Sequence, residues 1–221
     1  MAIHKLEHGH TIEFNEEKHV YIHNNEYVVG MSTLLGKLAS PMLENWKISQ
    51  QVNAIKTEME REGIPIDQIQ KIVTNAKSNA KKSGDNILNI GSMVHKFCEM
   101  WLKGEKFTDP SDPVILGCFE KFKNFWTKNK LKLVESEKVL YHEKGVCGTL
   151  DIIAKDSQNN LWLIDIKTSK GIFLNMVHQL HGYRYMYECQ TGKKINKMYI
   201  VRLPKDSGDF EARHILYKKE H

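Results

Sequence analysis

The sequence is poor in cysteine, proline and long apolar runs, and each shortage excludes a class of protein. Its 221 residues include 4 cysteines and 5 prolines. The cysteines are scattered without a C-x-x-C pair, so we expect neither a disulfide framework nor a zinc site. No apolar stretch approaches the length needed to cross a bilayer, and no apolar segment follows the first residues as in a secretory signal. We therefore expect a cytoplasmic protein without a membrane partner.

Charge and length set further bounds. The chain carries 32 Lys and Arg against 27 Asp and Glu, a formal net charge of +5. This mild excess suits a polyanion such as nucleic acid, and it also suits many ordinary proteins. The length and a hydrophobic content of 41% are enough for one good core. We expect a single domain over residues 1–221, with an N-terminal hairpin and helical part (1–84) and a core (85–221).

Turn and helix signals describe the N-terminal part. Residues 11–29 predict a β-hairpin around the turn-forming pair Asn24-Asn25. Ser32 is expected to cap a short helix, and two longer helices are expected over residues 41–63 and 67–84. The last of these helices has one basic side, which is either a solvated face or a surface that follows a phosphate backbone. That side includes Lys71, Lys77, Lys81 and Lys82.

The second part of the chain alternates between helical and extended patterns. Helices are expected over residues 86–103 and 113–129, strands over 133–141, 147–154 and 161–167, a helix over 174–189, and strands over 195–202 and 210–217. The order of the core is therefore helix, three strands, helix, strand. This order predicts an α/β fold with a mixed central sheet flanked by helices.

Acidic residues in two apolar strands point to metal chemistry. Asp165 and Lys167 point to the same side of their strand, because side chains alternate between faces. Asp151 lies in the middle of the preceding apolar strand, where an unpaired charge is costly. Two carboxylates on neighbouring strands can share Mg²⁺ or Mn²⁺, and a nearby lysine can offset charge in phosphodiester hydrolysis. Taken alone, Asp165 and Lys167 could instead be an exposed charge pair.

Two helices carry further candidates. Gly91, His95 and Glu99 recur every four residues, so they share one helical face. His95 is either a structural histidine or a metal or phosphate ligand. Gln179 and Tyr183 are also four apart, and they are either a surface glutamine beside a half-buried tyrosine or part of a site.

Taken together, these segments resemble the ordered motifs of RecB-like nucleases in the PD-(D/E)XK superfamily. The segments that carry the resemblance are Gly91-Ser92-Met93-Val94-His95 with Glu99, Gly148-Thr149-Leu150-Asp151, Asp165-Ile166-Lys167-Thr168-Ser169 and Gln179-Leu180-His181-Gly182-Tyr183. The resemblance spans residues 85 to 202. The region from Val20 to Trp46 is similar to the lead-in of phage-type and mitochondrial genome maintenance exonucleases.

The resemblance implies a role for each matching residue. Asp151 and Asp165 are expected to bind the metal with the backbone carbonyl of Ile166, and His95 to ligate it or lie beside it. Lys167 is expected to be the catalytic lysine. The remaining residues are expected to support the site: Glu137, with Glu135 as a competitor, and the Q-x-x-x-Y pair Gln179 and Tyr183. Only Cys189 follows Tyr183, so an iron-sulfur cluster of the kind found in some relatives is not expected.

The resemblance implies an Mg²⁺- or Mn²⁺-dependent DNA exonuclease of recombination, replication or repair, in a bacterial or phage-infected cell. A single-strand annealing or single-strand-binding protein is a further expected partner. The alternatives are a structure-specific or restriction-type endonuclease, or an inactive DNA-binding module of the same fold. Residues expected to contact DNA are Lys77, Lys81, Lys82, Lys170 and Arg184.

Overall fold

The computed structural model describes residues 2–15, 18, 20–37, 49, 50, 53, 57, 61, 89–205 and 208–216. The chain divides into two compact units, Met1–Lys37 with Met93–His221, here called the main unit, and Leu38–Ser92. The expected helices over residues 41–63 and 67–84 lie outside the described residues, apart from isolated helical positions between 49 and 61. Residues 2–37 belong to the same unit as the expected core, although they were expected beside the helical part.

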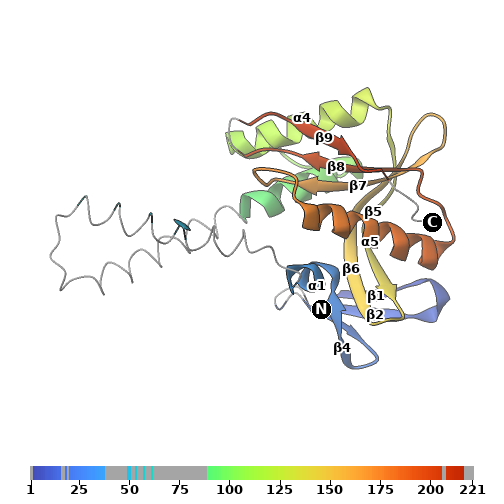
Figure 1. Ribbon diagram of the computed structural model, residues 1–221. Coiled ribbons are helices and arrows are strands. Elements are labelled where there is room, and N and C mark those ends of the chain that lie inside the picture. The colour runs from blue at the N-terminus through green and yellow to red at the C-terminus, as the bar shows by residue number, and fades with distance from the viewer. Residues whose placement is uncertain are drawn as a thin grey trace, which may run out of the picture. The chain divides into compact units, whose positions relative to one another are not determined.

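One mixed sheet of nine strands runs through the main unit (Figure 1). The strands are β1 (Ala2–Lys5), β2 (Thr11–Asn15), β3 (Val20–His23), β4 (Glu26–Gly30), β5 (Lys132–His142), β6 (Val146–Lys155), β7 (Leu161–Lys167), β8 (Lys197–Arg202) and β9 (Glu211–His214). Their order is β1-β2-β3-β4-β6-β7-β8-β9, and β5 pairs with β6 outside this path. The pairs β4·β6 and β7·β8 are parallel and the others antiparallel.

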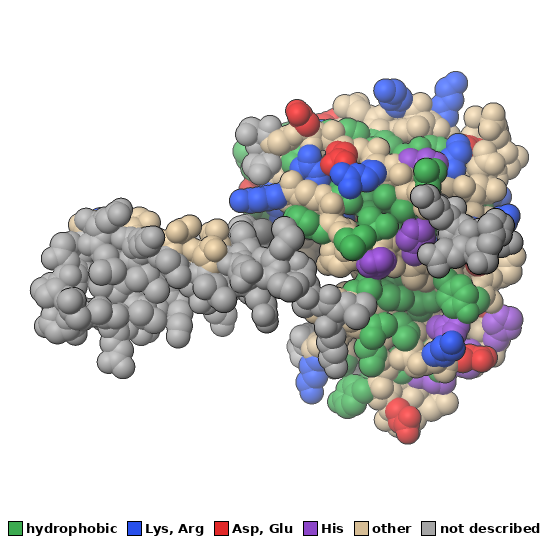
Figure 2. All heavy atoms as spheres, viewed as in Figure 1, with side chains coloured by type: hydrophobic (Ala, Val, Ile, Leu, Met, Phe, Trp, Pro, Cys, Tyr) green, Lys and Arg blue, Asp and Glu red, His purple; other side chains and the backbone are tan. Residues whose placement is uncertain are grey.

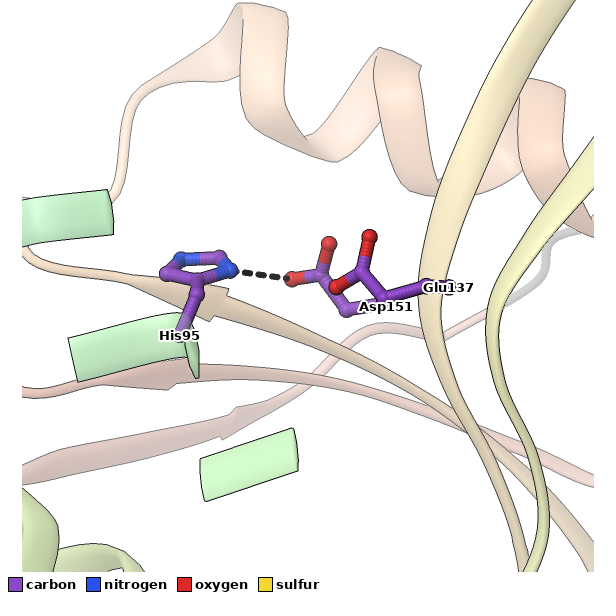
Figure 3. Close-up of side chains that lie close together, drawn as sticks. All are labelled: His95, Glu137 and Asp151. Carbon is purple, nitrogen blue, oxygen red and sulfur yellow. Dashed lines mark ion pairs between the residues drawn. The ribbon is translucent and has the colours of Figure 1, made fainter. Parts of the chain in front are cut away.

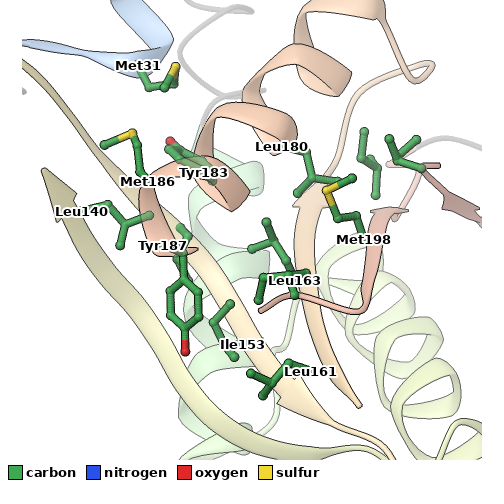
Figure 4. Packing of buried hydrophobic residues seen from close by; sticks show 14 residues of the cluster. Met31, Leu140, Ile153, Leu161, Leu163, Leu180, Tyr183, Met186, Tyr187 and Met198 are labelled. Atoms are coloured by element: carbon green, nitrogen blue, oxygen red, sulfur yellow. The ribbon is translucent and has the colours of Figure 1, made fainter. Parts of the chain in front are cut away.

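Helices cover both faces of the sheet, which confirms the expected fold class. They are α1 (Met31–Lys37), α4 (Pro113–Lys128), α5 (Leu174–Thr191) and a helix over residues 89–102. On β8, Met198 and Ile200 pack into the hydrophobic cluster beneath α5 (Figure 4), whereas the intervening Tyr199 contacts Phe125 of α4 on the opposite face. Among the described residues, no helix has the length and hydropathy needed to span a membrane.

Local signals explain where the helices begin and end. The Asp112 carboxylate accepts hydrogen bonds from the backbone N–H groups of Val114 and Ile115, and Pro113 occupies the first turn, so α4 starts there. α5 ends at Gly192, whose φ of 68° is a left-handed conformation that glycine adopts easily. The expected capping role of Ser32 is wrong, because α1 begins at Met31 and Ser32 lies within its first turn.

The main departure from the sequence analysis lies at the N-terminus. Three strands, β2 to β4, stand where one hairpin was expected, and β1 precedes them. The turn at Asn24 and Asn25 is confirmed, since both residues have the positive φ that this tight turn requires. Side chains of β2, β3, β5 and β6 pack into one small cluster. This part of the sheet is therefore strongly curved, so that β2 and β3 face β5 and β6. The buried members of this cluster are Ile12, Tyr21, Val139 and Cys147.

Strand β6 has a different neighbour at each end of one edge. β4 pairs with it at Val146 and Cys147, and β7 pairs with it over residues 152–155. Within the described part of the chain, residues 148–151 have no ladder partner on that edge, while β5 follows the other edge from end to end. The sheet therefore opens at Gly148–Asp151, within the segment that the sequence analysis singled out.

Gly148 allows Tyr183 to approach the backbone of β6 at this opening. A Cβ atom on Gly148 would lie 2.6 Å from Tyr183 Cε1 and 3.2 Å from Met31 Cβ. We expect Gly148→Ala to destabilise the protein by about 1–3 kcal/mol, the usual cost of overpacking a core. Thermal or denaturant unfolding would measure the change.

Gly117→Ala is the matched control, because no atom lies within 4 Å of a Cβ at Gly117 in α4. We expect that change to stabilise the protein by about 0.5–1 kcal/mol, as alanine does within a helix. Equal melting temperatures for Gly148→Ala and the wild type would contradict the close contact with Tyr183.

Candidate functional site

Glu137 and Asp151 face each other across β5 and β6. The pairs on either side of them, Ser136↔Ile152 and Lys138↔Leu150, are in register. Residues directly opposite in an antiparallel pair have their side chains on the same face of the sheet. The two carboxylates therefore lie side by side, as Figure 3 shows.

Asp165 stands at the same level on β7. The ladder between β6 and β7 ends at the pair Ile152↔Ile164, and Asp151 and Asp165 come one step beyond it. At this point the strands diverge, and an Asp151 side-chain oxygen accepts a hydrogen bond from the backbone N–H of Ile166 at 2.7 Å. A carboxylate thus satisfies a backbone group at the opening of the sheet, which fixes the orientation of Asp151.

His95 comes to these acids from the helix over residues 89–102. Its Nδ1 atom lies 3.7 Å from Asp151 Oδ2 (Figure 3). One ligand atom from each of His95, Glu137 and Asp151 lies within 4.8 Å of the others. Among the described residues, this is the one group of three or more histidine, cysteine or acidic side chains close enough to hold a metal ion.

The donor set fits a divalent cation. Two carboxylates and an imidazole supply oxygen and nitrogen ligands without sulfur, which suits Mn²⁺ and, through the oxygens, Mg²⁺. The cysteine nearest in sequence to His95, Cys98, is fully buried, and burial raises the pKa of its thiol, so it does not supply a thiolate. The predicted convergence of His95 and Asp151 is present in the structure, and Glu137 joins them as a candidate ligand.

Asp165 is held by Lys167. The Lys167 Nζ atom lies 2.9 Å from Asp165 Oδ1 and 2.7 Å from Oδ2. The Asp165 residue is only 1% exposed, and burial raises the pKa of its carboxyl group even though the lysine opposes the shift. In this arrangement Asp165 is outside the three-residue group, although it was expected to ligate the metal. The ion pair holds the half-buried Lys167 ammonium in place, and the charges of Asp165 and then Asp151 raise its pKa against the opposing effect of burial.

Glu137 adopts a costly backbone conformation. Its φ is 49°, in the left-handed region that disfavours a residue with a Cβ by roughly 1–2 kcal/mol. Although its side chain still reaches solvent, partial burial raises the pKa of its carboxyl group, and the nearby charges of Asp151 and Glu99 raise it further. Strain and repulsion at one residue are typical of a functional site.

Gln179 and Tyr183 meet on α5 as their spacing predicted. Gln179 Nε2 donates a hydrogen bond of 3.1 Å to the Tyr183 hydroxyl. Tyr183 is buried against Gly148, and the charges of Asp151 and Asp165 help to raise the pKa of its hydroxyl group, after burial itself. The tyrosine therefore packs behind the acids and bears on their position.

Sequence reasoning missed the contribution of the N-terminal strands. The Tyr21 hydroxyl on β3 is 2.9 Å from Thr149 Oγ1, next to Asp151. Met31 packs against Gly182 as well as Gly148. A tyrosine at the centre of a short strand gave no signal of such a distant partner.

Other expected residues lie apart from this group or outside the described part of the chain. Glu135 accepts a hydrogen bond from the Tyr187 hydroxyl and pairs with Lys138, so its carboxylate is engaged elsewhere. The Arg184 guanidinium bonds Glu188 on its own helix. Lys170 is exposed. The remaining expected DNA contacts, Lys77, Lys81 and Lys82, lie outside the described residues.

Basic side chains do not form a continuous stripe on the face seen in Figure 2. They gather toward its upper part, where Figure 1 places α4, β8 and β9, and acidic side chains are interspersed among them. On this face, the charge pattern alone does not mark a path for a polyanion.

Comparisons with known proteins give structural neighbours and no family. No protein-family model matches the chain, and no curated protein matches it. A repair endonuclease from Pyrococcus abyssi aligns at 18% identity over 44% of this chain and 39% of its own, with a TM-score of 0.29. A proposed exonuclease from Eubacterium rectale aligns at 12% identity over 57% of this chain and 59% of its own, with a TM-score of 0.36. The chain thus spans less than two thirds of the length of either protein.

The raised pKa of Glu137 leads to a prediction about the metal-free protein. The folded state keeps a proton that the unfolded state loses above the ordinary carboxyl pKa of about 4.3, so stability falls as the pH rises from there toward the raised pKa. In EDTA at pH 8, we expect Glu137→Gln to raise the melting temperature by about 1–2 °C, a modest gain because solvent screens the exposed carboxylate. The same change should weaken the stabilisation that added Mn²⁺ gives the wild type.

Glu135→Gln is the control, since it removes an acid two residues away that has partners of its own. We expect that variant to melt at a lower temperature and to keep the response to Mn²⁺. A lower melting temperature for Glu137→Gln in EDTA would refute the electrostatic repulsion inferred here.

Proposed function

We propose that this chain is a metal-dependent deoxyribonuclease that hydrolyses phosphodiester bonds. The observation that carries the proposal is that Glu137, Asp151 and Asp165 lie in adjacent positions on three neighbouring strands. Lys167 contacts Asp165, and His95 contacts Asp151. Acids that lie close together repel each other, which helps to raise the pKa values of Glu137 and Asp165, and a bound cation would offset that repulsion. The ordered motifs that resemble RecB-like nucleases support the same assignment.

Each residue has a task that its contacts support. Asp151, Glu137 and His95 would hold the cation, with Asp165 and the Ile166 carbonyl as the further ligands that the resemblance implies. The cation would polarise a phosphate group and acidify a water molecule. Lys167, fixed by Asp165, presents an ammonium group that can orient a nucleophile or offset negative charge as the phosphate reacts. Gln179 and Tyr183 support the strand that carries Asp151.

We further propose an exonuclease of recombination, replication or repair, of the phage type, acting in a bacterial or phage-infected cell. DNA is the proposed substrate, with a single-strand annealing or single-strand-binding protein as a proposed partner. Support for the exonuclease comes from the N-terminal lead-in, in which Met31 packs near Gly148 and Tyr21 bonds Thr149, both in the segment of β6 that leads to Asp151. Lys170, Lys77, Lys81, Lys82 and Arg184 remain the proposed DNA contacts.

Digestion of linear and covalently closed circular DNA tests the proposal. We expect loss of the linear forms with Mg²⁺ or Mn²⁺, no loss of the circles, and no loss of either in EDTA. Lys167→Ala should lower the rate by about 100-fold or more, because it removes a charge that acts on the reacting phosphate. Single- and double-stranded forms of both substrates would be measured in parallel.

Lys155→Ala is the matched control. Lys155 is exposed at the end of β6, so its replacement removes the same charge without touching the acids, and activity should be unchanged. Metal-dependent cutting of the circles would replace the exonuclease with an endonuclease. Binding of DNA without cutting in any metal would replace both with an inactive binding module.

A further inference from the structure

An open seam separates strands β1 and β5. The strand order β1-β2-β3-β4-β6, continued by β5 on the other edge of β6, returns the chain to the side of β1, as Figure 1 shows near the lower ends of β5 and β6. The two strands line one groove of about 860 Å³, formed by residues 3–7, residues 133–139 and Lys103. Among the described residues, β1 pairs with β2 alone and β5 with β6 alone, so neither strand uses its groove-facing edge in a ladder.

The backbone groups that face the seam follow from the hydrogen bonds on the paired sides. The N–H group of Leu6 donates to His10 O, in continuation of the β1·β2 ladder, so the alternate residues Ile3 and Lys5 direct their N–H and C=O groups to the seam. On β5, the Tyr141 N–H donates to the Gln190 side chain, away from β6. By the same alternation, Val139 directs its backbone groups to the seam.

The two free edges can accept the same guest strand. From β1 through β2, β3, β4 and β6 to β5, four pairs are antiparallel and one is parallel, so β1 and β5 run in the same direction. A strand inserted between them would therefore be parallel to both or antiparallel to both. Ser136 lines the groove, and its hydroxyl is buried without a hydrogen-bond partner among the described residues. An unpaired edge with an unsatisfied polar group beside it favours the addition of a strand.

The charges of the seam argue against a nucleic acid as its occupant. Three lysines and three glutamates line the groove, and Lys138 is paired with both Glu7 and Glu135. No excess of positive charge remains to hold phosphates. The apolar part of the lining includes Ile3, which is 67% exposed, together with Leu133 and Val134.

The size of the seam argues for a short segment rather than a second folded copy. β1 has 4 residues, which span about 13 Å at a rise of about 3.3 Å per residue. A stable dimer buries about 800 Å² per partner, whereas short extended peptides bind such edges through main-chain hydrogen bonds. We propose that the seam binds an extended peptide segment of a partner protein, with apolar side chains at alternate positions, as an added strand between β1 and β5. This inference does not depend on the proposed nuclease activity.

The experiment uses the full chain and a displayed library of random heptapeptides, selected on the wild type. We expect selected peptides to carry apolar residues at alternate positions and to slow hydrogen exchange at Ile3, Lys5 and Val139. Lys5→Pro removes a groove-facing donor and should weaken binding about tenfold or more. Ala212→Pro in the edge strand β9 is the control. The N–H of Ile215 donates to β8, so by alternation the N–H of Ala212 points to solvent, away from β8, and its loss should not affect the seam.

A second arm does not require any protein variant to fold. Selected peptides would be N-methylated at one backbone position at a time, and an added strand predicts loss of binding at alternate positions only. The proposal is overturned if no peptide is enriched, or if N-methylation and Lys5→Pro have no effect. Concentration-dependent dimerisation that Lys5→Pro abolishes would also overturn it, by showing that a second copy fills the seam.

Discussion

The hydrogen bond from the Ile166 backbone to the Asp151 carboxylate is the contact on which the site depends. A regular sheet would continue the β6·β7 ladder past Ile152↔Ile164 and satisfy its N–H groups with carbonyls. Here the strands separate, and a side-chain carboxylate takes over the N–H group of Ile166. This side-chain hydrogen bond, in place of a backbone one, orients Asp151 at the opening of the sheet, where His95 approaches it. The opening exists because β4 pairs with one end of this edge of β6 and β7 pairs with the other end.

Placing three acids at one level of a sheet is electrostatically unfavourable, and the surrounding residues offset only part of that cost. Lys167 neutralises Asp165, and the backbone N–H stabilises Asp151. Glu137 sits at a positive φ, and its pKa stays raised although the charge of Lys103 opposes the shift. A fold selected for stability alone would not retain such a residue opposite another acid. The unbalanced charge is therefore the feature that most favours a bound cation.

Much of this arrangement could be predicted from the sequence, because it depends on local periodicity. Alternation within β7 places Asp165 and Lys167 on one face, and helical spacing brings Gln179 to Tyr183. The register between β5 and β6, which joins Glu137 to Asp151, could not be derived in this way. It is set by the turn between the two strands and holds from His142↔Val146 to Glu135↔Ile153. β1 and the curl of the N-terminal strands were missed for a similar reason, since their small core is assembled from four separate strands.

Strand β5 joins the two features that periodicity could not predict. One of its edges pairs with β6 and carries Glu137 into the acidic group, while the other edge lines the seam. Glu137 has a positive φ, so it interrupts the regular pleat of β5. Glu137 therefore belongs both to the acidic group and to the lining of the seam.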